Sequence, residues 1–397
     1  MSAPLRTLHV AAMPFPSPQG TQAAVRAMVE ALVDAGRETH LLTYGVGTTP
    51  AGPMRFTWHK LAHRTGRNVV PVRSLRSGPS IGKVVLDLQL AATLRRLHRR
   101  LRPDLVVAHH VEACAAAWLA GARPLLFVAH TALEPELPTY FPRAVARPTA
   151  AAGLALDRDL ARRADAVAAI APALADYFER RAGVPPHPLP VPWTLPEPIR
   201  KGERLQARHR FGLADTDEVG LYAGNLDAYQ GWPQVVQALA RTAATRPGAR
   251  LLVATESDPR AVHAAARGQG VAERVRVIGL GDEASRRSAH AAADLALVPR
   301  RTPGGLPIKL LDALARGVPT AVTRTATAGL DLEGAALLVN DDDPEALAGA
   351  WRAAVQARRA TAEVAERGRA YVATRHTPGG FLRALDAVAD AMPLRRA

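Results

Sequence analysis

Short apolar runs alternate along this chain with longer segments in which apolar residues recur every third or fourth position. Short runs bounded by turn residues predict buried strands, and the longer period predicts amphipathic helices. The first runs are LHVAAM, THLLTY, LVVAHH, LLFVAHT and AVAAIA. The predicted helices lie at 23–35, 81–101, 112–119, 150–163, 232–244, 283–292, 343–375 and 377–392. Strands alternating with helices in this order predict an α/β fold with doubly wound parallel sheets.

A proline-rich stretch between Val184 and Lys201 divides the chain. A proline at nearly every second position cannot sustain a helix or a central strand, so a surface loop and a domain linker both fit. We favour the linker, because apolar runs separated by predicted helices resume after it. We therefore expect one Rossmann-like domain at 1–190, a second at 191–375, and a terminal helix at 376–397 that packs back towards the first domain. Two such halves leave a cleft between the carboxyl ends of their sheets.

Composition narrows the class of protein. The chain has 397 residues, of which 48% are apolar and 22% charged, as in a soluble globular protein. The single cysteine, Cys114, excludes an internal disulfide and favours a reducing cytoplasm. The net charge of +15 favours anionic partners, although nearly all of it is arginine in a chain rich in alanine and proline, so compositional drift explains it equally well. Aromatic residues are only 5% and no nucleic-acid motif is present, so we expect no nucleic-acid partner.

The segment 299–319, PRRTPGGLPIKLLDALARGVP, carries the clearest candidate chemistry. An apolar run ends there in basic residues and a Pro/Gly turn, and a helix is predicted to start at about Pro307. Such a turn offers free backbone N–H groups and a positive dipole end to a phosphate. Lys309 in the first helical turn could pair with that phosphate, and Asp312 could bind a ribose hydroxyl. An ordinary strand–helix crossover with a solvated end remains the alternative.

Two further groups of residues follow predicted strands in the first half. Gly20 and Thr21 lie in a loop (17–21) that joins a strand to a helix, where a glycine lets backbone approach an anion; a plain turn capped by Thr21 fits as well. His109 follows the run LVV, and His130 follows LLFVA. A lone histidine is more often structural, but histidines at two strand ends of one sheet also suit sugar binding or proton transfer.

Four stretches of the chain resemble one known family. PFPSPQGTQ (14–22), AHHVEA with AHTALEPELPTY (108–113 and 129–140), YAGNLDAYQGW (222–232) and the 299–319 segment occur in the order found in retaining glycosyltransferases of the GT-B fold, in glycosyltransferase family 4. The resemblance spans nearly the whole chain. It implies a GT-B enzyme that moves a hexose-type sugar from a nucleotide-diphosphate sugar to an acceptor, with retention and without a metal or other cofactor. The acceptor (a glycan, a lipid or a small molecule) is left open.

The resemblance also implies roles for individual residues. Those near the reacting sugar, with a catalytic role, are His109 and His130. Those expected to bind the donor phosphates are Gly20, Thr21, Gly224, Asn225, Gln230, Arg300 and Lys309. Those expected to bind the donor sugar or ribose are Gly304, Gly305, Leu306 and Asp312. Those expected on the acceptor side are Gln19, Glu134 and Glu136.

The chain departs from the family pattern in its charges. Asn225 and Gln230 stand where many members have an arginine and a lysine, and Gly304 stands where the first glutamate of a Glu-x7-Glu motif is usual. The turn Pro307-Ile308-Lys309 resembles a subgroup that lacks this glutamate, and Arg300, Arg301 and Lys309 could supply the missing positive charge. The departures also fit an alternative, a non-catalytic GT-B scaffold that binds a nucleotide or an anionic lipid.

One basic segment lies outside these motifs. Residues 94–102, LRRLHRRLR, form a basic amphipathic patch on a predicted helix. A solvated helix face explains it, and so does docking to anionic lipid headgroups, which would suit a lipid-linked acceptor. We therefore expect a cytoplasmic protein, with peripheral association at the inner face of the cytoplasmic membrane as a second expectation.

Overall fold

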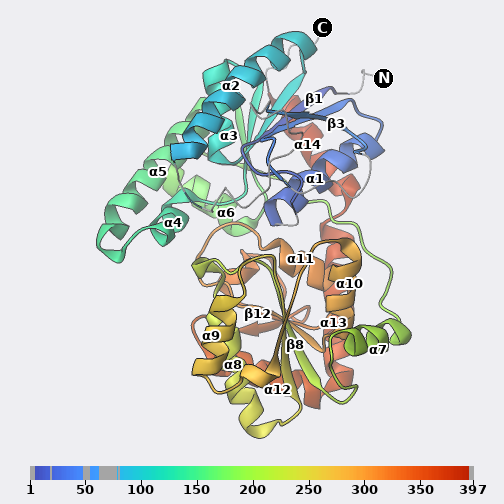
Figure 1. The fold of residues 1–397 in the computed structure, drawn as a ribbon. Helices are drawn as coiled ribbons and strands as arrows, with labels where there is room; N and C mark the ends of the chain where they lie inside the picture. Colours follow the sequence, from blue (N-terminus) through green and yellow to red (C-terminus); the bar gives the residue numbers. More distant parts are fainter. Residues whose placement is uncertain (1–4, 18–19, 48–53, 62–77, 79–80, 393–397) are drawn as a thin grey trace.

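The computed structural model of the protein describes residues 5–17, 20–47, 54–61, 78 and 81–392, and it consists of two α/β halves, one above the other in Figure 1. Each half is built around one parallel sheet with helices on both faces. This is the doubly wound α/β architecture that the alternation of apolar runs and helices predicts, in the two-domain GT-B arrangement that the family resemblance implies.

The first half contains a seven-stranded sheet in the order β3-β2-β1-β4-β5-β6-β7. Its strands are β1 (Thr7–Ala11), β2 (Thr39–Thr43), β3 (Thr57–Lys60), β4 (Leu105–His109), β5 (Leu125–Ala129), β6 (Ala166–Ala169) and β7 (His187–Pro188). Its helices are α1 (Gly20–Asp34), α2 (Ile81–Leu101), α3 (His110–Ala120), α4 (Leu133–Glu136), α5 (Ala146–Arg163) and α6 (Pro172–Tyr177). Strands β1, β4 and β5 are buried at every position, and most of their residues are apolar, as expected for a sheet covered on both faces.

The second half contains a six-stranded sheet in the order β10-β9-β8-β11-β12-β13. Its strands are β8 (Glu218–Ala223), β9 (Ala249–Ala254), β10 (Val275–Ile278), β11 (Leu295–Val298), β12 (Thr320–Thr323) and β13 (Leu337–Val339). The helices from here to the end of the described chain are α7 (Lys201–Arg210), α8 (Trp232–Thr245), α9 (Arg260–Gly268), α10 (Glu283–Ala292), α11 (Ile308–Ala315), α12 (Pro344–Gln356), α13 (Arg358–Arg375) and α14 (Pro378–Ala391).

The structure corrects the sequence prediction at the C-terminal end. Residues 343–375, predicted as one helix, form α12 and α13 with a break at Ala357, whose φ of −103° and ψ of 50° are not helical. No glycine or proline marks this break, so the apolar period alone does not reveal it. The proline-rich stretch also contributes a strand, β7, which pairs with β6 at the edge of the first sheet. An edge position tolerates proline because one side of the strand has no hydrogen-bond partner to supply.

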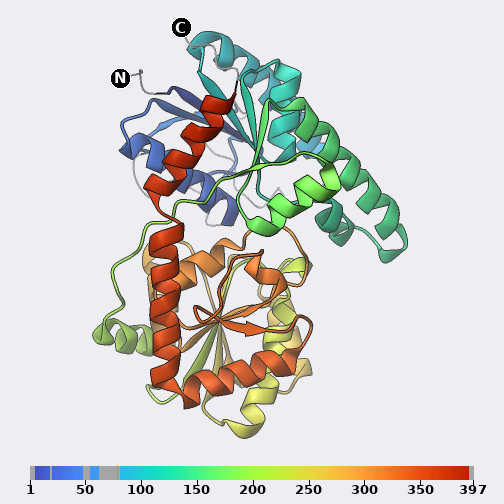
Figure 2. The same cartoon turned by 180° about the vertical axis from the view of Figure 1, so that it is seen from behind.

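Helix α14 lies against the first half, although α13 before it belongs to the second (Figure 2). It packs on α1 and β7. Arg37 after α1 donates two hydrogen bonds to the Asp386 carboxylate, at 2.6 and 2.8 Å. At the crossing point, the Trp193 N–H donates to the His376 carbonyl at 2.7 Å. The described helices include none with the length and apolarity needed to cross a membrane.

Candidate active site

The N-terminal ends of α1 and α11 meet where the two halves join. A Cβ atom placed on Gly20 would lie 3.4 Å from the Cβ of Ile308, and the two helices are in contact. A helix N-terminus carries partial positive charge and unpaired N–H groups. The fold therefore brings together two positive helix ends, one from each predicted phosphate loop, and Thr21 lies in the first turn of α1.

The loop before α11 lies directly on the first half. A Cβ atom on Gly305 would be 1.4 Å from the backbone oxygen of His130, so only glycine permits this approach. Leu306, the next residue, is buried. The structure thus places the predicted sugar-binding segment against one of the two predicted catalytic histidines.

Three buried histidines form a continuous chain that runs from the middle of β1 to the carboxyl ends of β4 and β5. His9 Nδ1 lies 2.9 Å from His109 Nε2, and His109 Nδ1 lies 2.9 Å from His130 Nε2. Burial lowers the pKa of His9 to about 3 and holds the pKa values of His109 and His130 well below the usual range, where neighbouring histidines lower them further. All three rings are therefore neutral at physiological pH.

His9 was not among the residues expected from the sequence. It lies inside the apolar strand β1, where a single polar residue gives no periodic signal. The available signal is the parallel register of β1 and β4, which pairs Ala11 with His109 and so places His9 and His109 on one face of neighbouring strands.

His110 adds a fourth ring to this group. Its φ of 69° lies in the left-handed region, which is unfavourable for a residue with a side chain. Its ring stacks on that of His130, with centroids 4.9 Å apart, and its Nε2 lies 3.5 Å from the Thr21 hydroxyl oxygen. Backbone strain at the end of β4 is thus accompanied by a contact that links the histidines to the start of α1.

Lys309 points from α11 to the segment 222–232, which is expected to bind the donor phosphates. Its ammonium donates to the Tyr222 hydroxyl at 3.2 Å, and in the described part of the chain no carboxylate lies at ion-pair distance from it. Burial, followed by the nearby Arg300 charge, lowers the pKa of Lys309 to about 7. Gly224, with φ of 149°, makes room for this side chain, since a Cβ there would lie 3.0 Å from Nζ.

Arg300 supports the loop that reaches the first half. Its guanidinium is buried, donates to the Gly305 carbonyl at 2.8 Å and to the Thr302 carbonyl at 3.2 Å, and stacks near Tyr229. A Cβ on Gly304 would lie 2.6 Å from the end of this guanidinium. Arg300 was expected to bind phosphate directly; in the structure its hydrogen bonds go to the backbone of the loop.

Asp312, expected to bind ribose, is paired within the second half. Its carboxylate accepts from Arg316 Nε at 3.0 Å and lies 3.9 Å from His290 Nε2. Arg316 is buried and also donates to Glu283 at 2.6 Å. A ribose hydroxyl at this carboxylate would have to share it with Arg316.

The segment 222–232, expected to bind the donor phosphates, has two neutral residues with unused hydrogen-bonding capacity. Asn225 Nδ2 donates to Asp227 at 2.7 Å. Among the described residues, Asn225 Oδ1 and Gln230 Oε1 are buried without a hydrogen-bond partner. The segment thus holds two neutral amide groups, and it approaches Lys309 through Tyr222 and Gly224.

The predicted acceptor-side residues already have partners in the first half. Glu134 forms an ion pair with Arg181, and Glu136 accepts from the Tyr140 hydroxyl at 2.8 Å. Gln19 lies outside the described residues. Their role towards an acceptor stays a prediction.

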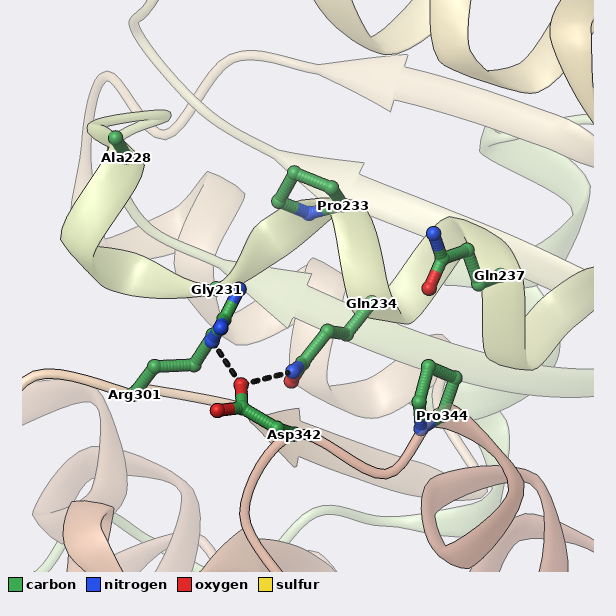
Figure 3. A pocket seen from close by; sticks show the side chains of 8 residues that line it. All are labelled: Ala228, Gly231, Pro233, Gln234, Gln237, Arg301, Asp342 and Pro344. Carbon is green, nitrogen blue, oxygen red and sulfur yellow. Dashed lines mark hydrogen bonds and ion pairs between the residues drawn. The ribbon is translucent and has the colours of Figure 1, made fainter.

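A pocket of about 280 Å³ lies beside the segment 222–232, at the N-terminal ends of α8 and α12 (Figure 3). It is lined by Ala228, Gly231, Pro233, Gln234, Gln237, Arg301, Asp342 and Pro344. Asp342 forms an ion pair with Arg301 and accepts from Gln234 Nε2 at 3.0 Å. Arg301, expected to help hold phosphate, is therefore neutralised by a carboxylate.

No group of His, Cys, Asp and Glu in the described residues is arranged to hold a metal ion.

Fold and family models together define the class. Two parallel-sheet halves in contact through their predicted phosphate-binding segments have the arrangement of a GT-B glycosyltransferase. The model of Glycosyltransferase Family 4 matches residues 18–191, and that of Glycosyl transferases group 1 matches residues 217–357. The chain belongs to glycosyltransferase family 4.

Similar proteins agree with this class. A D-inositol 3-phosphate glycosyltransferase of Segniliparus rotundus is 27% identical over 286 residues, which are 68% of this chain and 62% of that protein. One of Geodermatophilus obscurus is 28% identical over 81% of this chain and 77% of its own length. The chain therefore matches about three fifths (62%) of the length of the Segniliparus rotundus protein.

Solved structures show the same fold. Sucrose-phosphate synthase from Thermosynechococcus elongatus has a TM-score of 0.78 at 19% identity and covers 97% of this chain and 98% of its own. HepE from Anabaena, in complex with UDP-glucose, has a TM-score of 0.74 at 16% identity, covering 97% of this chain and 100% of its own.

Proposed function

We propose that this glycosyltransferase uses a nucleotide-diphosphate hexose as donor and transfers the sugar with retention, without a bound metal ion. One observation carries the proposal: Lys309 follows Ile308, at which the N-termini of α1 and α11 meet, and among the described residues its ammonium has a hydroxyl, not a carboxylate, as its polar partner. Such a cation and two positive helix ends suit a diphosphate. The UDP-glucose bound to the fold neighbour HepE supports the same class of ligand.

The chemistry asks for stabilisation of the leaving diphosphate. In the proposed step the bond between the anomeric carbon and the diphosphate oxygen breaks, the acceptor oxygen bonds to that carbon from the same face, and the acceptor proton passes to the departing diphosphate. Lys309 and the ends of α1 and α11 are placed to offset the charge that develops there. Gly305 holds the sugar-binding loop against His130, so the two halves close around the reacting centre.

The second candidate function is a GT-B scaffold that binds a nucleotide without turnover. The pairing of Asp312 with Arg316 and the neutral Asn225 and Gln230 favour it. Incubation of the protein with UDP- and GDP-linked hexoses distinguishes the two candidate functions. Release of nucleoside diphosphate above the buffer rate, lost in Lys309→Met, supports the enzyme. Saturable binding of the nucleotide without release supports the scaffold.

Exposed residues on the outer surface of α2 support a proposal for the acceptor. This helix exposes Val84, Val85 and Leu88, at 58%, 52% and 59% of their surface, and its C-terminal half exposes Arg95 and Arg99. Apolar and basic residues exposed on one helix suit an interface with anionic lipid. We propose that the enzyme acts on an acceptor at such a surface, at the inner face of the cytoplasmic membrane. The relatives named for D-inositol 3-phosphate keep a phosphorylated polyol as the alternative acceptor.

Vesicle binding tests the surface. The protein should sediment with vesicles that contain phosphatidylglycerol and not with vesicles of phosphatidylcholine alone. Glutamine at Arg95 and Arg99 should weaken this binding, whereas glutamine at Arg260, an exposed arginine of α9 in the second half, should not. Equal binding of both vesicle types would remove the proposal.

A further inference from the structure

The chain of three histidines has two unpartnered ends. His9 Nε2 and His130 Nδ1 are both buried, and neither has a hydrogen-bond partner among the described residues. Between them, two close contacts of 2.9 Å join His9 to His109 and His109 to His130. Every nitrogen of His109 is therefore used, and only the outer nitrogens of the chain are open.

Counting the N–H hydrogens of the three rings shows that all the hydrogen bonds of the chain point the same way. A neutral imidazole carries one N–H, and each contact between two rings needs one hydrogen and one lone pair. Two arrangements satisfy both contacts. In the first, all three rings carry the hydrogen on Nδ1, so His130 ends in an N–H and His9 in a bare nitrogen. In the second, all carry it on Nε2, and the ends are reversed.

The surroundings of the two ends favour the first arrangement. His9 lies in the middle of β1 between Leu8 and Val10, which are fully buried, and a buried N–H without an acceptor is among the rarest features of folded proteins. His130 lies at the carboxyl edge of the sheet, between the His110 ring and the Gly305 loop. His130 Nδ1 is buried as well, but an oxygen of a donor bound at this edge would adjoin it, whereas the interior of β1 has no ligand-binding position.

We infer that His9 is a positioning residue that acts through His109 to hold His130 in the Nδ1–H tautomer, so that His130 presents a hydrogen-bond donor to an oxygen of the bound sugar or diphosphate. In this arrangement His130 binds and orients an oxygen and does not remove a proton from the acceptor. The ligand and the preference for this arrangement rest on the proposed function, and the tautomer itself can be measured in the free protein.

Nitrogen NMR of the protein labelled with ¹⁵N-histidine tests the tautomer directly. Long-range ¹H–¹⁵N spectra distinguish Nδ1–H, Nε2–H and charged rings, and single-site variants assign the signals among the 13 histidines. The expected result is that His9, His109 and His130 are neutral and carry Nδ1–H. An Nε2–H form of His130 in the wild-type protein would overturn the inference.

Two substitutions test the action through His109. In His9→Asn the side-chain amide can still donate to His109 Nε2, whereas His9→Leu removes the donor. The leucine variant should alter the His130 spectrum and lower kcat by about tenfold, the effect of about 1.4 kcal/mol, with the acceptor KM unchanged. The asparagine variant should keep the wild-type tautomer and rate. A His130 spectrum unchanged in a folded His9→Leu would also overturn the inference.

The outcomes separate this inference from the proposed function. A protein that shows the Nδ1–H chain but hydrolyses or transfers no sugar contradicts the proposed function and leaves the positioning role of His9 intact. Sugar transfer with His130 in the Nε2–H form contradicts only the positioning role.

Discussion

The backbone of Gly305, in the second half of the molecule, lies against the carbonyl oxygen of His130 in the first, so closely that a Cβ at Gly305 would be 1.4 Å from that oxygen. His130 directly follows β5, and Gly305 lies in the loop between β11 and α11. The contact joins the two halves at a residue whose ring is a catalytic candidate.

Gly305→Ala should therefore lower kcat/KM by at least about tenfold, because the loop must retreat from His130 and small displacements in an active site cost this much or more. Gly268→Ala is the control, because this exposed glycine ends α9 and nothing lies within 4 Å of a Cβ placed there. Steady-state kinetics with a nucleotide hexose measures both. Equal effects of the two alanines would show that the His130 contact does not matter for turnover.

Lys309→Met should lower kcat/KM by about 100-fold, since one donor to developing charge is worth about 3 kcal/mol. Lys201→Met, at an exposed position of α7, serves as control and should leave the rate unchanged. Melting temperatures compare folding of the two variants. A rate in Lys309→Met close to that of the wild type would remove Lys309 from the phosphate site.

The lowered pKa of Lys309, about 7, predicts two effects of pH. Lysine is charged below its pKa, so kcat/KM for the donor should fall as the pH rises through about 7, and Lys309→Arg should remove this fall because arginine stays charged. Stability should change in the opposite sense. An unfolded lysine has a pKa of about 10.4, so between these two values the unfolded state binds more protons, and the contribution of Lys309 to the free energy of unfolding rises with pH.

A pH series of kcat/KM and of denaturant unfolding, for the wild type and Lys309→Met, measures these effects. The difference in unfolding free energy between the two proteins should depend on pH in the range above neutrality. A pH-independent difference would mean that Lys309 keeps an ordinary pKa.

Asp312→Asn should lower the free energy of unfolding by about 1–3 kcal/mol, because it leaves the buried Arg316 guanidinium with fewer acceptors. The chain offers a matched control in the pair Asp159 and Arg163, which has the same spacing of four residues but lies exposed on α5. Asp159→Asn should change stability little. Denaturant unfolding compares them. If Asp312 also binds ribose, titration with a nucleoside diphosphate should show weaker binding in Asp312→Asn alone.

Much of the fold follows from local pattern. Apolar runs and helical periods are local properties, so both parallel sheets and the start of α11, within one residue of Pro307, could be predicted. The break at Ala357 and the edge strand β7 could not, because the first has no breaker residue and the second depends on a neighbour distant in sequence. The domain boundaries at 190 and 375 stay predictions.

The site was predictable to the extent that parallel strands align their carboxyl ends. His109 and His130 were expected at one edge, and the structure places them in contact. His9 and the loop-supporting role of Arg300 depend on side-chain packing, which no spacing reveals. The pairing of Asp312 with Arg316 had a readable signal, since residues four apart on a helix face each other.

The most direct test of the account measures nucleoside diphosphate released from UDP- and GDP-linked hexoses by the wild-type protein and by Lys309→Met. The account predicts release with at least one donor, slow without an acceptor, and loss of that release in the variant while its melting temperature is kept. Saturable nucleotide binding by the wild type with no release from any of these donors, with or without candidate acceptors, would contradict it.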